Sequence, residues 1–207
     1  MVDRERQSRM YQLFTILIDS IFPPGEEERI VRAVNSRIAR ALYHEQNESG
    51  WTALSSFRDS TIRALIHEAK YENSAHAQSL LGELVEEYRI RHPEKQNAVW
   101  IPIPLSQKRE RLRGYNQVTS VLTHANITVD SSVLRRTRDT QPQTDLDKRE
   151  RLLNMHDAFE CLLPEQVRGQ DIILIDDVVT TGATLRACDV ALAPHAPRSI
   201  TLIAIAH

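Results

Sequence analysis

Hydrophobic side chains recur every three or four residues along the first part of the chain, which predicts two amphipathic helices. The first covers residues 4–22 and ends before the two prolines at 23 and 24, and the second covers residues 26–46. Residues 46–50 are polar, so we expect a linker there. We therefore divide the chain into an N-terminal helical segment, residues 1–50, and a second domain, residues 51–207.

The second domain alternates short apolar runs with amphipathic stretches. We expect strands at residues 51–57, 98–104, 132–136, 171–175 and 200–205, and helices at residues 59–70, 74–92, 115–124, 147–154 and 182–192. Residues 106–114 are expected to form a basic loop and residues 137–147 an exposed, mobile one. Strands that alternate with helices predict an α/β fold with a mostly parallel sheet and helices on its faces.

Composition and charge exclude several classes of protein. The 26 basic and 28 acidic residues give a net charge of −2, so the chain does not bind nucleic acid through bulk charge. Two cysteines cannot build a disulfide framework or a four-cysteine zinc site. The early apolar run at residues 13–18 is too short to span a membrane. Asp3 and Glu5 argue against a secretory signal, so we expect a cytoplasmic protein with no membrane partner.

The strongest local signal lies at residues 171–184, where an apolar strand ends in Asp176 and Asp177 and a loop rich in hydroxyl groups leads into a helix. Backbone N–H groups of residues 180–184, together with the start of the helix, can bind a phosphate. Carboxylates beside that phosphate would accept hydrogen bonds from sugar hydroxyls or hold Mg²⁺. The residues therefore suggest a ribose phosphate site, and a solvated turn with a good helix cap stays open as the alternative.

Residues 172–184 resemble the 5-phosphoribosyl 1-pyrophosphate (PRPP) motif of type I phosphoribosyltransferases. The resemblance implies that Asp176 and Asp177 hold the ribose hydroxyls and Mg²⁺, and that both take part in catalysis. It assigns PRPP binding also to the residues that follow them, which are Val178, Thr180, Thr181, Gly182, Ala183 and Thr184.

A second set of residues is similar to the ComF branch of that family. These are residues 101–105, Arg109, residues 113–117 and residues 62–71, which include Lys70, and the resemblance covers about residues 51–207. ComF-like proteins often carry a zinc-binding cysteine cluster after an apolar segment that ends in Phe-Pro-Pro. Here Phe22, Pro23 and Pro24 are followed by no such cysteines. The resemblance thus implies the type I phosphoribosyltransferase fold. The zinc module is absent, or the N-terminal helical hairpin that the hydrophobic pattern predicts replaces it.

The resemblance also assigns the binding of pyrophosphate and the closing of the site. Leu105 and Ser106 would contact pyrophosphate, helped by basic residues that include Arg109 and Arg113. Residues 135–151 resemble the loop that closes over PRPP; Gln141, Gln143 and Arg149 are its candidate residues, and Arg149 is a candidate catalytic group. Each of these stretches can equally be a solvated polar surface, and Lys70 can be a solvated helix end.

The resemblance implies a magnesium-dependent enzyme, a glycosyltransferase that transfers the phosphoribosyl group of PRPP to a nitrogen nucleophile and releases pyrophosphate. Two other hypotheses remain open. One is a non-catalytic competence or DNA-uptake factor that binds single-stranded DNA or a helicase-like partner, which the resemblance and the basic residues 108–113 suggest. The other is a regulator that senses PRPP. A homodimer is compatible with all three.

Overall fold

The structure is a computed structural model that describes residues 25–48, 50–137 and 158–207. The helix predicted at residues 4–22, and with it one arm of the predicted hairpin, lies outside the described residues. So do the helix predicted at 147–154, all of the predicted 137–147 loop except residue 137, and Gln141, Gln143 and Arg149.

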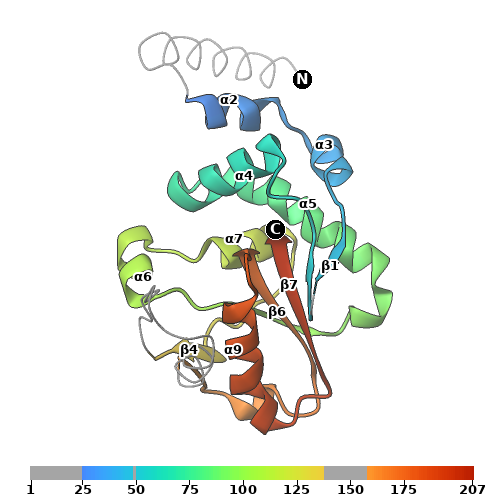
Figure 1. The fold of residues 1–207 in the computed structure, drawn as a ribbon, viewed down its shortest axis with the longest axis vertical. Coiled ribbons are helices and arrows are strands. Elements are labelled where there is room, and N and C mark those ends of the chain that lie inside the picture. The colour runs from blue at the N-terminus through green and yellow to red at the C-terminus, as the bar shows by residue number, and fades with distance from the viewer. Residues whose placement is uncertain (1–24, 49, 138–157) are drawn as a thin grey trace, which may run out of the picture.

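A five-stranded sheet forms the centre of the fold, in the order β1-β2-β7-β6-β3 (Figure 1). Its strands are β1 (Gln46–Glu48), β2 (Trp51–Ala53), β7 (Ser199–Ala206), β6 (Asp171–Val178) and β3 (Val99–Pro102). Every neighbouring pair is parallel except β1 and β2, which confirms the predicted mostly parallel α/β fold. A separate antiparallel pair joins β4 (Leu134–Arg136) to β5 (Phe159–Cys161), a strand that the sequence pattern did not predict.

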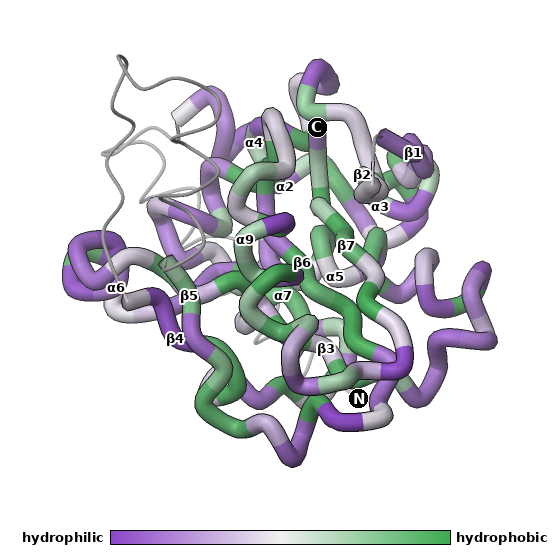
Figure 2. The backbone as a smooth tube through the Cα atoms, turned by 60° about the horizontal axis from the view of Figure 1, so that its bottom comes forward, coloured by the Kyte–Doolittle hydropathy of each residue, from purple (hydrophilic) through white to green (hydrophobic). Residues whose placement is uncertain are grey.

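Helices cover both faces of the sheet, and the alternation of side chains along β6 shows why. Ile173 and Ile175 pack into a core with α4 (Ser60–Tyr71), α5 (Ala75–Arg91) and α7 (Gln117–His124). Ile172 and Leu174 point the other way and pack with α9 (Ala183–Leu192). A strand that is buried on both faces must be apolar at successive positions, which is the pattern that residues 172–175 show. The hydrophobic β6 and β7 accordingly lie in the middle of the molecule (Figure 2).

Two helix starts that the sequence predicts are confirmed by their caps. Asp59 precedes α4, and its Oδ1 accepts hydrogen bonds from the backbone N–H groups of Thr61 at 2.7 Å and Ile62 at 3.2 Å. Ser74 precedes α5, and its hydroxyl accepts from the N–H group of Ala77 at 3.3 Å. These bonds satisfy donors that the first turn of a helix leaves without a backbone partner. Both caps are local to the sequence, which is why the pattern was sufficient to place them.

The N-terminal part of the described chain differs from its prediction. The single helix expected at residues 26–46 is two short helices, α2 (Glu26–Ala33) and α3 (Ser36–Ala41), because Asn35 caps the second one through its side chain. The linker expected at 46–50 contains β1, which pairs with β2. The described helices α2 and α3 share a core with α4 and α5. The domain boundary at residue 50 stays a prediction.

Residues 106–114 were predicted as a basic loop, and that prediction is wrong. They contain α6 (Gln107–Arg113), which Ser106 caps through its hydroxyl and which Gly114 ends in the left-handed conformation, with φ of 75°. The helix has no buried residue, so no apolar stripe reveals it in the sequence. Single-turn helices, η1 (Pro93–Lys95), η2 (Pro164–Gln166) and η3 (Ala193–His195), complete the described elements.

Within residues 25–48, 50–137 and 158–207, no helix is both long enough and apolar enough to cross a bilayer.

The central position of β6 leads to a stability prediction. We expect Ile173→Ala to lower the free energy of unfolding by about 2–5 kcal/mol, because Ile173 is fully buried and its loss leaves a cavity. Ile38→Ala, at a side chain that is 42% exposed, is the control and should change it by less than about 1 kcal/mol. Urea denaturation measures both values, and equal losses would contradict the assigned core.

Candidate functional site

Two acidic residues stand at the C-terminal end of the central strand β6. Because neighbouring side chains of a strand point to opposite faces, Asp177 lies on the side of α4 and α7, and Asp176 lies on the side of α9. Asp177 is only 7% exposed, whereas Asp176 is partly accessible. Ligands of open α/β sheets bind at this end of the strands.

Asp177 is held by three donors. Lys70 Nζ, from the C-terminal turn of α4, lies 2.8 Å from Asp177 Oδ2, and Gln117 Nε2, from the first turn of α7, donates to the same oxygen at 2.6 Å. The backbone N–H group of Val178 donates to Oδ1 at 2.7 Å. A buried carboxylate needs such partners, since removal from water is costly for an unpaired charge.

Their surroundings shift the pKa values of the two carboxyl groups in opposite directions. Burial by itself would raise the pKa of Asp177, but the charge of Lys70 and the hydrogen bonds from Lys70, Val178 and Gln117 hold that pKa below its usual value. Burial, and then repulsion from ionised Asp177, raise the pKa of Asp176 to about 7. Near neutral pH Asp177 is therefore ionised, and Asp176 is protonated in about half of the molecules.

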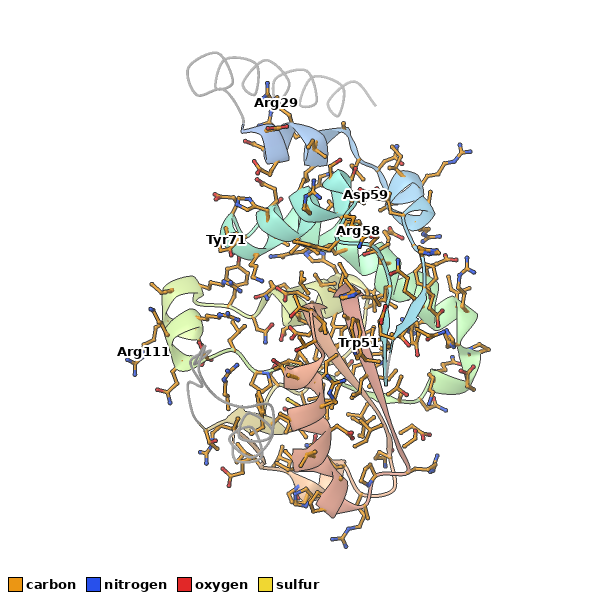
Figure 3. The ribbon with its side chains drawn as sticks, in the orientation of Figure 1. Arg29, Trp51, Arg58, Asp59, Tyr71 and Arg111 are labelled. Carbon is orange, nitrogen blue, oxygen red and sulfur yellow. The ribbon has the colours of Figure 1, made fainter. Side chains whose placement is uncertain are left out.

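Residues 113–117 run from the end of α6 to the start of α7 and hold the donors Lys70 and Gln117 in place. Arg113 Nη1 donates to Gln117 Oε1 at 2.7 Å, which leaves the amide nitrogen of Gln117 facing Asp177. The guanidinium of Arg113 also lies over the ring of Tyr71, 5.3 Å from its centroid. Tyr71 stands at the end of α4 that carries Lys70 (Figure 3). Tyr115 donates its hydroxyl to the carbonyl of Ala69 at 2.9 Å. Arg113 thus acts on Asp177 through Gln117.

The loop after β6 carries groups that can bind an anion. Gly182 has φ of 71° and precedes α9, whose first backbone N–H groups point back toward the loop. Thr180 and Thr181 are exposed and Thr184 is half-buried, and the hydroxyls of Thr180 and Thr184 have no partner within the described chain. The guanidinium of Arg186, one turn into α9, donates to the carbonyl of Thr181 and adds positive charge beside the loop.

Glycine is required at position 182 for two reasons. A positive φ disfavours residues that carry a Cβ, and a Cβ at this position would lie 2.6 Å from Nε1 of Trp51. Trp51 in β2 therefore packs directly against the loop, and its ring makes an edge contact with His207 at 5.0 Å between centroids. His207 Nδ1 lies 2.7 Å from the carbonyl oxygen of Val179. Trp51 is a core residue with an exposed fraction of 6%.

The other predicted residues lie around the end of β3, the neighbour of β6. Leu105 and Ser106 follow that strand and are half-buried, and the hydroxyl of Ser106 accepts from the N–H group of Arg109. The side chain of Arg109 is exposed on α6. The structure thus brings Asp176, Asp177 and residues 178–184 together at the C-terminal end of β6, and Lys70 lies beside Asp177. It leaves Arg109 at the periphery.

Gln117 and the backing role of Arg113 were missed by reasoning from sequence. Both belong to residues 113–117, which the resemblance singled out; it gave Gln117 no function and assigned Arg113 to pyrophosphate. The sequence shows only that Gln117 is a polar residue at a helix start, and the fold shows that it is 4% exposed and so needs a buried partner.

The acid pair fits Mg²⁺ only as a partial ligand set. In the described parts of the chain there is no cluster of three or more acidic, histidine or cysteine side chains that could hold a metal ion by itself. Mg²⁺ commonly binds through one or two carboxylates, with phosphate oxygens and water completing its shell. Asp176 and Asp177 can supply the carboxylates.

The raised pKa of Asp176 predicts a stability cost with a defined sign. In the unfolded chain Asp176 loses its proton near pH 4, and in the fold near pH 7, so the folded state binds more protons between those values and stability falls as pH rises. Asp176→Asn should flatten this slope and raise the melting temperature at pH 8, measured by scanning calorimetry.

Asp130→Asn is the matched control, because hydrogen bonds from Ser132 lower the pKa of Asp130. An Asp group of that kind stabilises the fold above its unfolded pKa and loses this contribution as pH falls through its folded pKa. The control should therefore lower stability at pH 8. An Asp176→Asn protein that is less stable than the wild type at pH 8 would contradict the assigned environment.

A known protein family and several curated proteins match parts of this chain. The family model described as "Phosphoribosyl transferase domain" matches residues 114–207. "DNA utilization protein YhgH" of Escherichia coli K12 is 32% identical over 133 residues, which are 60% of this chain and 57% of that protein. "Competence protein ComFC" of Bacillus subtilis is 37% identical over 97 residues, 45% of this chain and 37% of that protein.

A solved structure titled as the allosteric regulatory enzyme of purine biosynthesis is 13% identical to the chain. The match covers 68% of this chain and 30% of that one, with a TM-score of 0.41, a likeness that carries no argument about function. The alignments span 57% and 37% of these two relatives, so what those proteins do as a whole is not transferred. The family model and the relatives together support a ComF-family, phosphoribosyltransferase-like protein.

Proposed function

We propose that the protein binds PRPP with Mg²⁺ and transfers its phosphoribosyl group to a nitrogen nucleophile. The observation that carries this proposal is the acid pair of β6 standing directly before the loop that starts α9. Sugar hydroxyls need acceptors and a phosphate needs donors, and here the two kinds of group occupy neighbouring positions on one strand–loop–helix unit.

The ribose hydroxyls would be held by Asp176 and Asp177. Lys70 and Gln117 keep Asp177 ionised and fixed, so its free lone pairs accept from a hydroxyl. Asp176 is the more accessible of the two acids and holds its proton more readily. Mg²⁺ would neutralise the pyrophosphate and would favour the ionised form of Asp176.

The 5-phosphate would lie on the loop of residues 180–184. Its oxygens would accept from the N–H groups at the start of α9 and from the hydroxyls of Thr180 and Thr184, which are without protein partners in the described chain. The close packing of Trp51 on Gly182 keeps that loop in its left-handed conformation. Pyrophosphate would then extend toward Leu105 and Ser106 after β3.

In the transfer itself, the lone pair of the nucleophile forms a bond to C1 of the ribose while the bond from C1 to pyrophosphate breaks. The electrons of that bond leave with pyrophosphate, which also takes up the proton that the attacking nitrogen loses. Mg²⁺, when bound, would neutralise part of the charge of pyrophosphate. The chain's own residues hold the ribose and the phosphate, so that C1 is presented in a fixed orientation. Catalytic roles for Asp176, Asp177 and Arg149 stay predictions.

A second candidate function is the binding of single-stranded DNA, and an observation on α6 favours it. Lys108, Arg109 and Arg111 are exposed on this helix next to Leu112, which is 76% exposed. Basic side chains beside an exposed apolar one can contact both the phosphates and the bases of a single strand. The name of the relative in Escherichia coli, a DNA utilization protein, agrees with this candidate.

A cytoplasmic location, a homodimer, a helicase-like partner and a purely PRPP-sensing role stay predictions. The sensing role differs from the transferase in one respect, since it requires PRPP binding without release of pyrophosphate.

Calorimetry tests PRPP binding. We expect binding that needs Mg²⁺, and we expect Asp177→Asn and Thr184→Ala each to weaken it about tenfold or more, because each removes a strong hydrogen bond to the ligand. Asp189→Asn and Thr123→Ala change the same residue types away from the site and should leave the affinity unchanged. The proposal fails if the wild type binds no PRPP, or if both site variants bind it as well as the wild type does.

Fluorescence anisotropy with a labelled oligothymidine tests the second candidate. Binding should weaken steeply with salt, and replacement of Lys108, Arg109 and Arg111 by Ala should reduce both the affinity and the slope by about 0.7 per lost contact. Replacement of half-buried Lys95 and exposed Arg168, two basic residues outside α6, is the control. Absent or salt-independent binding would remove this candidate.

A further inference from the structure

A cavity of about 570 Å³ lies between α6, α7 and β4, beside the loop that follows β3. The helix α6 and the strand β4 are both on the left of the molecule in Figure 1. Asp176, Asp177 and residues 178–184, all of which the structure describes, do not line this cavity. Its volume is typical of a site for a small molecule.

We propose that this cavity binds a nucleoside monophosphate. The phosphate would lie on β4, the ribose on α6 and α7, and the base on the apolar wall beside the loop after β3. This would be a ligand site separate from the acid pair, and it goes beyond the proposed transfer, which does not use it.

The free edge of β4 supplies backbone donors for a phosphate. In the antiparallel pair with β5, the N–H group of Leu162 donates to the carbonyl of Val133 at 2.8 Å, and that of Thr137 donates to the carbonyl of Ala158 at 2.9 Å. Bonded and non-bonded positions alternate in such a pair, so the N–H group of Leu134 points away from β5. Leu134 lines the cavity and is only 2% exposed. A buried N–H group of this kind needs an acceptor.

Two arginines stand at the same edge. Side chains alternate along a strand, so Arg135 and Arg136 leave β4 on opposite faces, and both line the cavity. Arg135 Nη2 lies 2.6 Å from Glu160 Oε2, a contact that leaves the other donors of its guanidinium available. The guanidinium of Arg136 lies 5.4 Å from the centroid of the Phe159 ring, which holds it in place. A phosphate at this edge would therefore meet a guanidinium on either side.

The walls formed by α6 and α7 carry groups that suit a ribose. The hydroxyl oxygen of Thr119 lies 3.5 Å from that of Ser131, and Ser120 donates to the carbonyl of Asn116 at 3.4 Å. These long contacts leave each hydroxyl able to bind a further partner. Within the described residues, the side chain of Glu110 has no hydrogen bond and no ion pair. Its carboxylate would accept from ribose hydroxyls and would repel a second phosphate, which favours a monophosphate over pyrophosphate.

Aromatic and aliphatic side chains form the third wall. The hydroxyl of Tyr115 donates to the carbonyl of Ala69 at 2.9 Å, so this ring is fixed before any ligand binds. Pro104 and Leu105 stand beside it, and Leu162 lines the cavity although it is 40% exposed. A fixed ring and aliphatic groups give a base a surface on which it can stack at little entropic cost.

Calorimetry on the full chain without Mg²⁺ tests the proposal. The probes are AMP, GMP, CMP and UMP, together with three molecules that each lack a part of the ligand: the matching nucleoside, ribose 5-phosphate and pyrophosphate. We expect at least one nucleotide to bind with one site per chain. Each of the three incomplete molecules should bind at least about tenfold more weakly, because each loses the contacts of one wall or more.

Variants assign the binding to this cavity. Arg135→Gln and Glu110→Gln should each weaken the nucleotide about threefold to tenfold, as expected for one lost charge-assisted hydrogen bond at a partly exposed wall. Glu160→Gln is the matched control for Arg135, because it breaks the same ion pair and lies outside the cavity. Glu165→Gln, at an exposed acid on η2, is the control for Glu110. Neither control should weaken binding.

Asp177→Asn and Thr184→Ala distinguish this cavity from the proposed PRPP site. Both should leave the affinity for the nucleotide unchanged. If they weaken it, the nucleotide binds at the acid pair and the proposal is wrong. It is also overturned if no nucleotide binds, if an incomplete molecule binds as tightly as the nucleotide, or if Arg135→Gln and Glu110→Gln bind it like the wild type. A protein that binds a nucleotide through Arg135 but binds no PRPP would keep this site and refute the proposed transfer.

Discussion

The buried carboxylate of Asp177 is the constraint on which the arrangement of the site depends. A charge that is removed from water must be paired, and the fold meets this demand with Lys70 from α4, Gln117 from α7 and the backbone of Val178. These contacts join two helices to the end of the central strand. They also keep Asp177 ionised, and its charge adds to the effect of burial in raising the pKa of the neighbouring Asp176 to about 7.

The second constraint is steric and lies on the following loop. Gly182 must be glycine because of its positive φ and because Trp51 occupies the space that a Cβ would need. The residue is thereby fixed between β2 and the start of α9, and the surface proposed to bind phosphate is formed before any ligand arrives. Lys70, which pairs with Asp177, also lines a cavity between α2 and α4, so that cavity adjoins the acid pair.

How far the sequence predicted the molecule depended on how local each signal was. The strand–loop–helix unit at residues 171–192 could be predicted because its apolar run, acids, hydroxyls and glycine are consecutive. The contact of Gln117 with Asp177 joins residues 60 positions apart, and no spacing rule predicts it. The helix α6 was not predicted because it buries no side chain, and β1 was not predicted because the sequence of a polar edge strand resembles a linker. The cavity between α2 and α4 depends on tertiary packing alone.

Calorimetry of Mg²⁺ and PRPP binding at pH 7 in two buffers of different ionisation enthalpy tests the central claim most directly. If Asp176 is about half protonated at pH 7 and binding of the ribose and Mg²⁺ displaces that proton, the wild type releases roughly half a proton more than Asp176→Asn, in which the titration of PRPP itself remains. Equal proton release by the two proteins, with PRPP bound by both, would show that the acid pair does not receive the ligand and would contradict the account.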